Sequence, residues 1–149
     1  MSAVRDPFLD LPLDGLRLIG ASAGTGKTYT LGTLVTRLVI ERGLRIGDIL
    51  AVTFTDAATQ ELRERLRRRL LLAARIAADD PALIAAEDDG ERAITRELVR
   101  AQAEHEGAAA LRSRLQRAAR EIDLAAVVTI HGFCARVLAE HALETGQPF

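Results

Sequence analysis

The residues with the clearest chemistry lie in the segment ASAGTGKT, from Ala21 to Thr28. It matches the phosphate-binding loop pattern of Gly, four residues and Gly-Lys-Ser/Thr, except that Ala21 replaces the first glycine. Glycines in such a loop let successive backbone amides point at phosphate oxygens. We expect Lys27 to reach the β- and γ-phosphates of ATP and the Thr28 hydroxyl to bind Mg²⁺. The predicted nucleotide-binding residues are Ala21, Ser22, Ala23, Gly24, Thr25, Gly26, Lys27 and Thr28, the last two with catalytic roles.

The use of lysine supports this interpretation. The chain has 20 basic residues, and Lys27 is the only lysine among them. A phosphate-binding loop needs a compact ammonium among its backbone amides, and the broad guanidinium of arginine does not fit there. The single lysine therefore stands at the one motif position that arginine cannot fill.

A second candidate lies at Thr53–Thr55, where an apolar run gives way to a helical pattern. Phe54, one of five aromatic residues in the chain, could stack on a nucleic-acid base while neighbouring hydroxyls meet phosphates. It could equally be a core residue beside a threonine that caps the next helix. Five arginines follow: Arg63, Arg65, Arg67, Arg68 and Arg69. We interpret them as a solvated helix face, in which some pair with Glu61 and Glu64 at helical spacing.

A third candidate is the segment TIHGF at 129–133. His131, with Thr129 before it and a glycine after it, could reach a phosphate or a sugar. By itself this signal is weak, because a lone histidine in apolar surroundings is more often structural. His105, His141 and Cys134 form no metal-binding pattern.

The surrounding patterns predict an α/β fold with a parallel sheet. An irregular lead-in over 1–15 precedes a strand at 16–21, a helix over 27–42 closed by Gly43, and a buried strand at 49–54. A helix with Leu62, Leu66 and Leu70 on one face begins at Thr55 or Asp56. A helical block over about 57–122 precedes a third strand at 127–130 and a last helix over 131–144.

Composition excludes several classes of protein. The 21 acidic residues balance the 20 basic ones, so a polyanion partner would have to be met by local patches. One cysteine excludes an intrachain disulfide, and no apolar run is long enough for a membrane span. We see no secretory signal either, and a cytoplasmic protein is expected.

Together the three motifs resemble those of superfamily 1 DNA helicases of the UvrD/Rep type, most closely the RecB-type β subunit of exodeoxyribonuclease V. The resemblance runs from LPLDGLRLIGASAGTGKTYTL through VTFTDAATQELRERL to TIHGFCARVL, and so covers nearly the whole chain. It implies a RecA-like P-loop domain, incomplete here and occupying 16–149, with helices inserted before the third strand. It also implies ATP and Mg²⁺ at Ala21–Thr28, and DNA contacts at Phe54, Thr55, Thr129, His131 and Phe133.

The same resemblance implies that the partners are single-stranded or duplex-end DNA and RecC- and RecD-type subunits. It also implies a role in DNA unwinding for double-strand break repair and recombination. Asp14 stands where the family often has an adenine-reading glutamine, and Gly20 where it often has glutamate. A carboxylate pair for hydrolysis is missing, because LIAAEDDG at 83–90 is interpreted as an acidic helix end. We therefore expect an N-terminal piece of a longer helicase–nuclease subunit, without its nuclease domain, that binds ATP weakly and hydrolyses it negligibly.

Two alternatives stay open at this point. The chain could be a non-catalytic module that binds nucleotide or single strands and regulates a partner. It could also be another P-loop enzyme such as a small kinase, although that hypothesis leaves VTFTDAAT and TIHGF unexplained. Nucleotide turnover measured with and without single-stranded DNA tests the kinase hypothesis. A reading frame that continues past Phe149 into a hydrophobic strand ending in Asp-Glu would favour the helicase subunit over the non-catalytic module.

Overall fold

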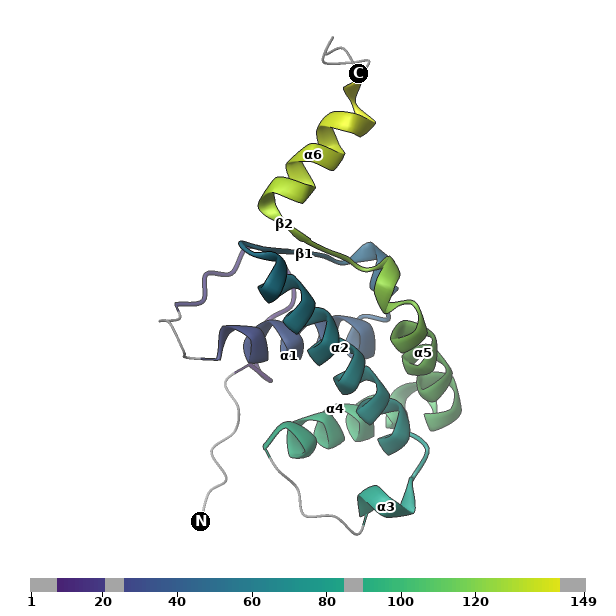
Figure 1. Ribbon diagram of the computed structural model, residues 1–149. Helices are drawn as coiled ribbons and strands as arrows, with labels where there is room; N and C mark the ends of the chain where they lie inside the picture. Colours follow the sequence, from purple (N-terminus) through teal and green to yellow (C-terminus); the bar gives the residue numbers. More distant parts are fainter. Residues whose placement is uncertain (1–7, 21–25, 85–89, 143–149) are drawn as a thin grey trace.

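The fold is built around a small parallel sheet with helices packed mainly against one face. The computed structural model describes residues 8–20, 26–84 and 90–142. Strands β1 (Leu50–Thr53) and β2 (Ala126–Thr129) pair in parallel, with Leu50 opposite Ala126 and Thr53 opposite Thr129. Figure 1 shows the four longest helices on one side of these strands, while the last helix points away on the other side.

The elements alternate as expected for a parallel connection. Helix α1 precedes the first strand, α2 follows it directly, and a helical segment leads to the second strand, after which α6 begins. In chain order the helices are α1 Lys27–Glu41, η1 Ile46–Asp48, α2 Asp56–Ile76, α3 Pro81–Ile84, α4 Gly90–Glu106, α5 Ala108–Arg120, η2 Ile122–Leu124 and α6 Ile130–Glu140. The α/β class and the parallel pairing are thus confirmed. The finer RecA-like assignment stays a prediction.

Helix α2 is the centre of the core. Its predicted apolar face is buried, with Leu62, Leu66 and Leu70 each at most 1% exposed. This face packs against α1, α5 and α4, and the start of the helix also contacts the strands. Burying a leucine side chain contributes about 1.5–3 kcal/mol, so this stripe fixes where α2 lies. Among the described residues, the other large apolar side chains that are fully buried are Val39, Ile40, Ile46, Leu111, Leu115, Ile122 and Val127.

The C-terminal end of α1 is closed by glycine and by an arginine from α5. Gly43 has φ 65°, a left-handed conformation that favours glycine after a helix. Arg114 donates hydrogen bonds to the carbonyls of Val39 (3.1 Å) and Ile40 (2.7 Å). Carbonyls in the last turn of a helix have no amide donor within the helix, so they need such a partner. The same guanidinium pairs with Glu106, and this hydrogen bond holds the pKa of the Glu106 carboxyl below its ordinary value although partial burial raises it.

The lead-in segment is irregular, as expected, and lies against the second half of α1. The Arg37 guanidinium, 6% exposed, donates to the carbonyls of Phe8 (2.6 Å) and Leu11 (2.7 Å) and pairs with Glu41. Asp14 forms an ion pair with Arg42, the C-cap residue of α1. In this structure Asp14 therefore lies at the opposite end of α1 from Lys27.

Two predictions about strands are wrong. Residues 16–20 form no strand, and Leu16 (94% exposed) and Leu18 (99% exposed) contact little of the protein. Strand β1 is not buried on both faces either, because Leu50 and Val52 are 47% and 40% exposed. An apolar run becomes a buried strand only where a neighbouring strand and a covering layer are available to it. Helix α2 packs against one face of β1, and the exposed side chains of Leu50 and Val52 lie on the other face.

Candidate nucleotide and DNA site

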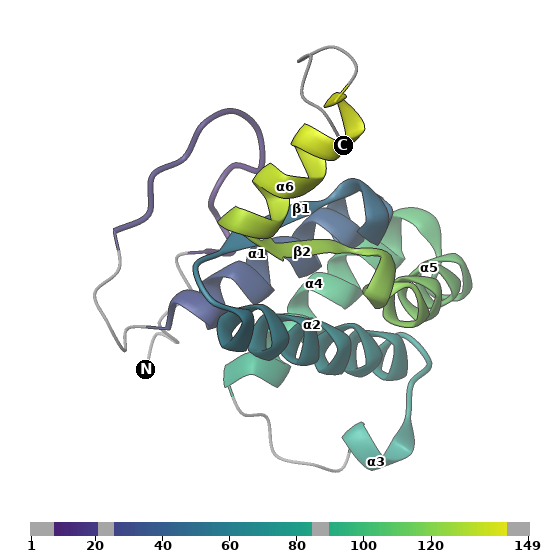
Figure 2. The same ribbon diagram turned by 45° about the horizontal axis from the view of Figure 1, so that its top comes forward.

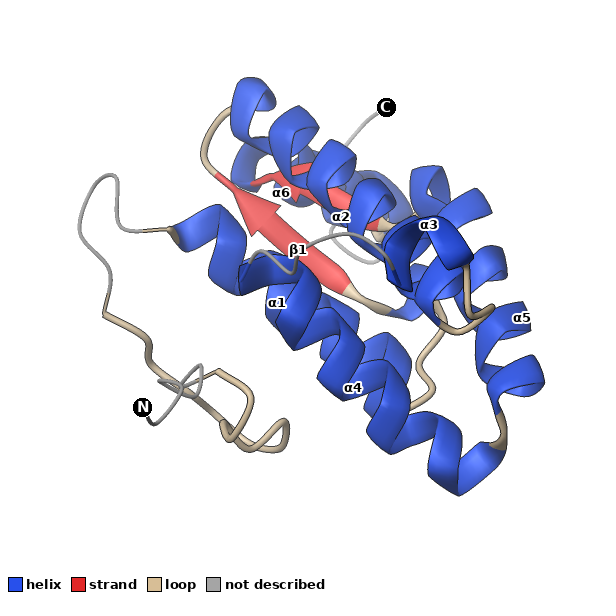
Figure 3. Cartoon of the chain, turned by 90° about the horizontal axis from the view of Figure 1, so that it is seen from below, coloured by secondary structure: helices blue, strands red, loops and turns tan. Residues whose placement is uncertain are grey.

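Three helices begin at the same edge of the molecule. Figure 2 shows β1 and β2 running side by side in the same direction, with α6 continuing from the end of β2. In Figure 3 the arrowhead of β1 lies at the end of the molecule where α1 begins. Because Thr53 is the register partner of Thr129, both strands end at the same level. The starts of α1, α2 and α6 thus gather where ligands bind in parallel α/β sheets.

The start of α1 carries positive charge, and among the described residues no acidic side chain lies in its first turn to compensate it. Gly26 precedes it with φ 82°, and the amide of Thr30 donates to the Gly26 carbonyl at 2.9 Å. No side chain caps this end, no acidic residue lies in the first turn, and Lys27 is exposed. A lysine beside the positive end of a helix dipole is unfavourable by a few tenths of a kcal/mol unless an anion is near. This arrangement fits a phosphate group.

The junction between β1 and α2 is a capped turn with an exposed aromatic ring. The Thr55 hydroxyl accepts a hydrogen bond from the amide of Ala58 at 3.1 Å, which confirms the predicted N-cap. Thr53 and Thr59 share a hydrogen bond of 2.6 Å between their hydroxyls beneath this turn. Phe54 is 85% exposed, so the alternative that it is a core residue is wrong for this structure.

The junction between β2 and α6 repeats the same design. The Thr129 hydroxyl accepts from the amide of Gly132 at 3.1 Å. A Cβ added to Gly132 would lie 3.2 Å from that hydroxyl oxygen, closer than most real Cβ contacts, so glycine keeps the cap tight. His131 is exposed and Phe133 is half-buried. None of the side chains of α6, all of which are described, is buried.

The arginines of α2 are not simply a solvated face. Arg69 is 1% exposed, and Arg63 donates to the Val127 carbonyl at 2.8 Å. Only part of the prediction holds: Arg68 is exposed, and Arg67 forms the predicted ion pair with Glu64 (3.9 Å), although its closer partner is Asp123 (2.8 Å). The buried position of Arg69 was missed, although its spacing of three and seven residues from Leu66 and Leu62 places it on the apolar stripe.

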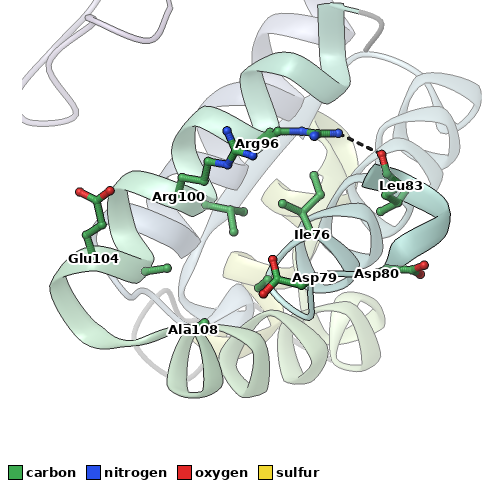
Figure 4. Close-up of a pocket in the computed structure, with 11 residues that line it drawn as sticks. Ile76, Asp79, Asp80, Leu83, Arg96, Arg100, Glu104 and Ala108 are labelled. Atoms are coloured by element: carbon green, nitrogen blue, oxygen red, sulfur yellow. Dashed lines mark hydrogen bonds between the residues drawn. The ribbon is translucent and has the colours of Figure 1, made fainter. Parts of the chain in front are cut away.

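A largely apolar cavity lies elsewhere. It has a volume of about 330 Å³ and is bounded by the last turn of α2, α3 and α4. Figure 4 shows Ile76 and Leu83 in this cavity, with Arg96 donating to the Leu83 carbonyl. Because α2 has 21 residues, its far end lies about 30 Å from Thr55. This cavity is therefore separate from the three helix starts.

Several predicted residues lie outside the described part of the chain. They are Ala21, Ser22, Ala23, Gly24 and Thr25 of the loop, together with most of the acidic segment 83–90. Within the described ranges, no cluster of His, Cys, Asp or Glu side chains could hold a metal ion. Across those ranges, too, no helix is both long and apolar enough to span a membrane.

Comparison with known proteins decides the family. Residues 9–148 match the family model of the UvrD/REP helicase N-terminal domain. The chain belongs to this family. The resemblance drawn from the three motifs is thus confirmed, and the helicase N-terminal domain occupies nearly the whole chain.

Individual relatives agree with this assignment. The domain is 38% identical to RecBCD enzyme subunit RecB of Haemophilus influenzae over 95% of this chain. It is 41% identical to the protein of the same name from Escherichia coli over 97% of this chain, and 41% identical to that of Mycolicibacterium smegmatis over 81%. The aligned region spans only 12%, 12% and 10% of these three relatives, respectively.

Proposed function

We propose that this chain is the ATP-binding N-terminal segment of a RecB-type, ATP-dependent DNA helicase and exonuclease subunit. The observation that carries the proposal is that three helices begin at the same edge of the molecule. One start presents Lys27 without a cap, and the other two present Phe54 and His131 beside threonine caps. A triphosphate and a single strand of DNA are the ligands that suit these two kinds of helix start.

The nucleotide half of the site depends on α1. The amides of its first turn and the ammonium of Lys27 would hold the β- and γ-phosphates, and the Thr28 hydroxyl would bind Mg²⁺. Magnesium bound between phosphate oxygens neutralises charge during phosphoryl transfer. Residues 21–25 would complete the loop, as the sequence pattern predicts.

The DNA half depends on the two capped turns. Stacking on Phe54 would suit any base, which a protein that moves along a strand requires. Thr55 and Thr129 accept hydrogen bonds from helix amides. Accepting occupies a lone pair, so each hydroxyl proton can still be donated to a phosphate oxygen. His131 and Phe133 would add a second contact one strand spacing away, about 4.8 Å.

In its full-length setting the protein would unwind DNA from duplex ends together with RecC- and RecD-type subunits, in double-strand break repair and recombination. The relatives named RecBCD enzyme subunit RecB support this proposal. For the 149-residue chain alone we propose nucleotide binding with negligible hydrolysis. Hydrolysis needs carboxylates at a strand end, and both described strands end in threonine.

Titration calorimetry with Mg²⁺–ATPγS tests the nucleotide site. Lys27→Ala should abolish measurable binding, and Lys27→Arg should weaken it strongly, because a guanidinium does not fit among the loop amides. Arg45→Ala is the matched control: it also removes one positive charge, from an exposed residue beyond the far end of α1. Unchanged affinity in Lys27→Ala would refute the proposal.

Turnover of ATP by the parent protein separates the proposed segment from a non-catalytic binding module. A non-catalytic binding module and the proposed segment both predict negligible hydrolysis by this chain. They differ in the parent protein, where only a helicase subunit shows turnover stimulated by single-stranded DNA. Robust DNA-stimulated hydrolysis by the 149-residue chain would contradict the proposal that this chain alone hydrolyses ATP negligibly.

A further inference from the structure

The buried guanidinium of Arg69 joins the helix that follows Phe54 to the helix that begins with Lys27. Its side chain has no exposed surface, which is unusual for arginine unless its charge is met by partners. Arg69 lies on α2, and its partners come from α1 and α4. It is therefore placed to transmit the position of one helix to another.

The contacts on α1 converge on a single residue of its first turn. Arg69 Nη1 donates to the Thr33 hydroxyl at 2.7 Å, and that hydroxyl donates onward to the Tyr29 carbonyl at 3.0 Å. The guanidinium carbon also lies 5.3 Å from the centre of the Tyr29 ring, within the range of a cation–π contact. Tyr29 directly follows Thr28, so both its backbone and its ring are held next to the predicted phosphate contacts.

Helices α1 and α2 approach each other closely at Gly32. A Cβ added to Gly32 would lie 3.4 Å from Cδ of Arg65 and 3.9 Å from Nη1 of Arg69. Glu91, at the start of α4, lies 3.5 Å from Nη1 of Arg69 and meets its charge from the other side. The guanidinium, carried by α2, thus has partners on both α1 and α4.

We propose that Arg69 is a positioning residue: through Thr33 and Tyr29 it holds the first turn of α1 in the geometry that binds nucleotide. The inference depends on the proposed function, since it concerns the affinity of that site. It also implies that the helix which carries the DNA contacts and the helix which carries Lys27 are joined by a specific polar link. Packing of apolar side chains alone would not provide such a link.

Two buried threonines of α1 give a matched test. Thr33 and Thr36 are both fully buried, and each donates a hydrogen bond to the carbonyl four residues earlier. Thr33 accepts from Arg69 in addition. Replacing either by valine removes one hydroxyl at nearly constant volume, and Thr33→Val should cost more stability because it also leaves the buried Arg69 without one acceptor. Only Thr33→Val should weaken binding of Mg²⁺–ADP, by roughly tenfold, the scale of coupling within a hydrogen-bond network.

The measurement is titration calorimetry with Mg²⁺–ADP, well below the unfolding temperature of each variant. Thr33→Ser keeps the hydroxyl and should bind as the wild type does. Arg69→Lys keeps the charge but cannot both reach Thr33 and cover the ring, so it should weaken binding as Thr33→Val does. If Thr33→Val does not fold, the comparison of Thr33→Ser with Arg69→Lys decides the question.

The double variant gives a readout that a general loss of stability would not. If Arg69 acts through Thr33, the combined loss of affinity in Thr33→Val with Arg69→Lys is smaller than the sum of the two single losses. Full additivity, or equal nucleotide affinity in Thr33→Val and Thr36→Val, would overturn the inference. Failure of the wild-type protein itself to bind nucleotide would refute the proposed function instead.

Discussion

Replacing Phe54 by alanine should separate DNA binding from folding. The ring is 85% exposed, so only about a seventh of its 150–250 Å² is buried in the folded chain. At about 25 cal/mol per Å², that burial contributes less than about 1 kcal/mol to stability. A stacked base would contribute about 1–3 kcal/mol, so affinity for single-stranded DNA should fall by roughly 5- to 150-fold.

Fluorescence anisotropy of a labelled oligonucleotide, recorded over a range of salt concentrations, measures this effect. Phenylalanine carries no charge, so the slope of log affinity against log salt should stay the same while affinity falls at every salt concentration. Leu124→Ala is the control, because Leu124 is 68% exposed but precedes β2 at the opposite edge. Its affinity for DNA should equal that of the wild type.

Two results would refute this reasoning. Affinity of Phe54→Ala within about twofold of the wild type would mean that the ring stacks on no base. A loss of several kcal/mol in the free energy of unfolding would mean that Phe54 is packed in solution, contrary to its exposure in the structure. Urea denaturation of the same preparations distinguishes the two outcomes.

Further predictions concern the N-cap of α2 and one ion pair. Thr55→Ala should lower the free energy of unfolding by about 1 kcal/mol in urea denaturation, because α2 loses its N-cap but remains packed. Glu106→Gln should be less stable than the wild type at neutral pH. Since the hydrogen bond from Arg114 holds the folded-state pKa of Glu106 below the ordinary 4.5, its stabilisation is present above that pH and disappears as the pH falls through the folded-state value. Urea denaturation from pH 7 downward should show the two proteins converging in acid, and a gap that persists there would contradict the assignment.

Local patterns were enough to predict most of the elements. The helix that begins at Lys27, the strand that ends at Thr53 and the cap at Thr55 follow from periodicity and from the preference of threonine for N-caps. These features depend on residues that are close in sequence. The family followed from the same motifs, because their order and spacing are specific.

What could not be predicted depends on which surfaces meet. The apolar run that contains Leu16 and Leu18 predicted a strand, but both side chains are exposed. A strand needs a hydrogen-bonding neighbour, and no local pattern reveals whether one is available. Arg69 was predicted to be solvated together with the neighbouring arginines, although its spacing from Leu62 and Leu66 places it on the buried face of α2. Its partners Thr33 and Glu91 lie 36 residues before it and 22 after it, respectively, so the chemistry that allows its burial is invisible to a local pattern.

The parallel register of the two strands links packing to recognition. Val127 faces the core and is 1% exposed, while Thr129, two residues on, ends the strand beside Thr53. Side chains alternate between faces, so sliding β2 by a single residue would expel Val127 from the interior and misalign the two helix starts. A substitution at such a core position would therefore act twice, once on stability and once on the spacing of the surface turns that the core holds in place.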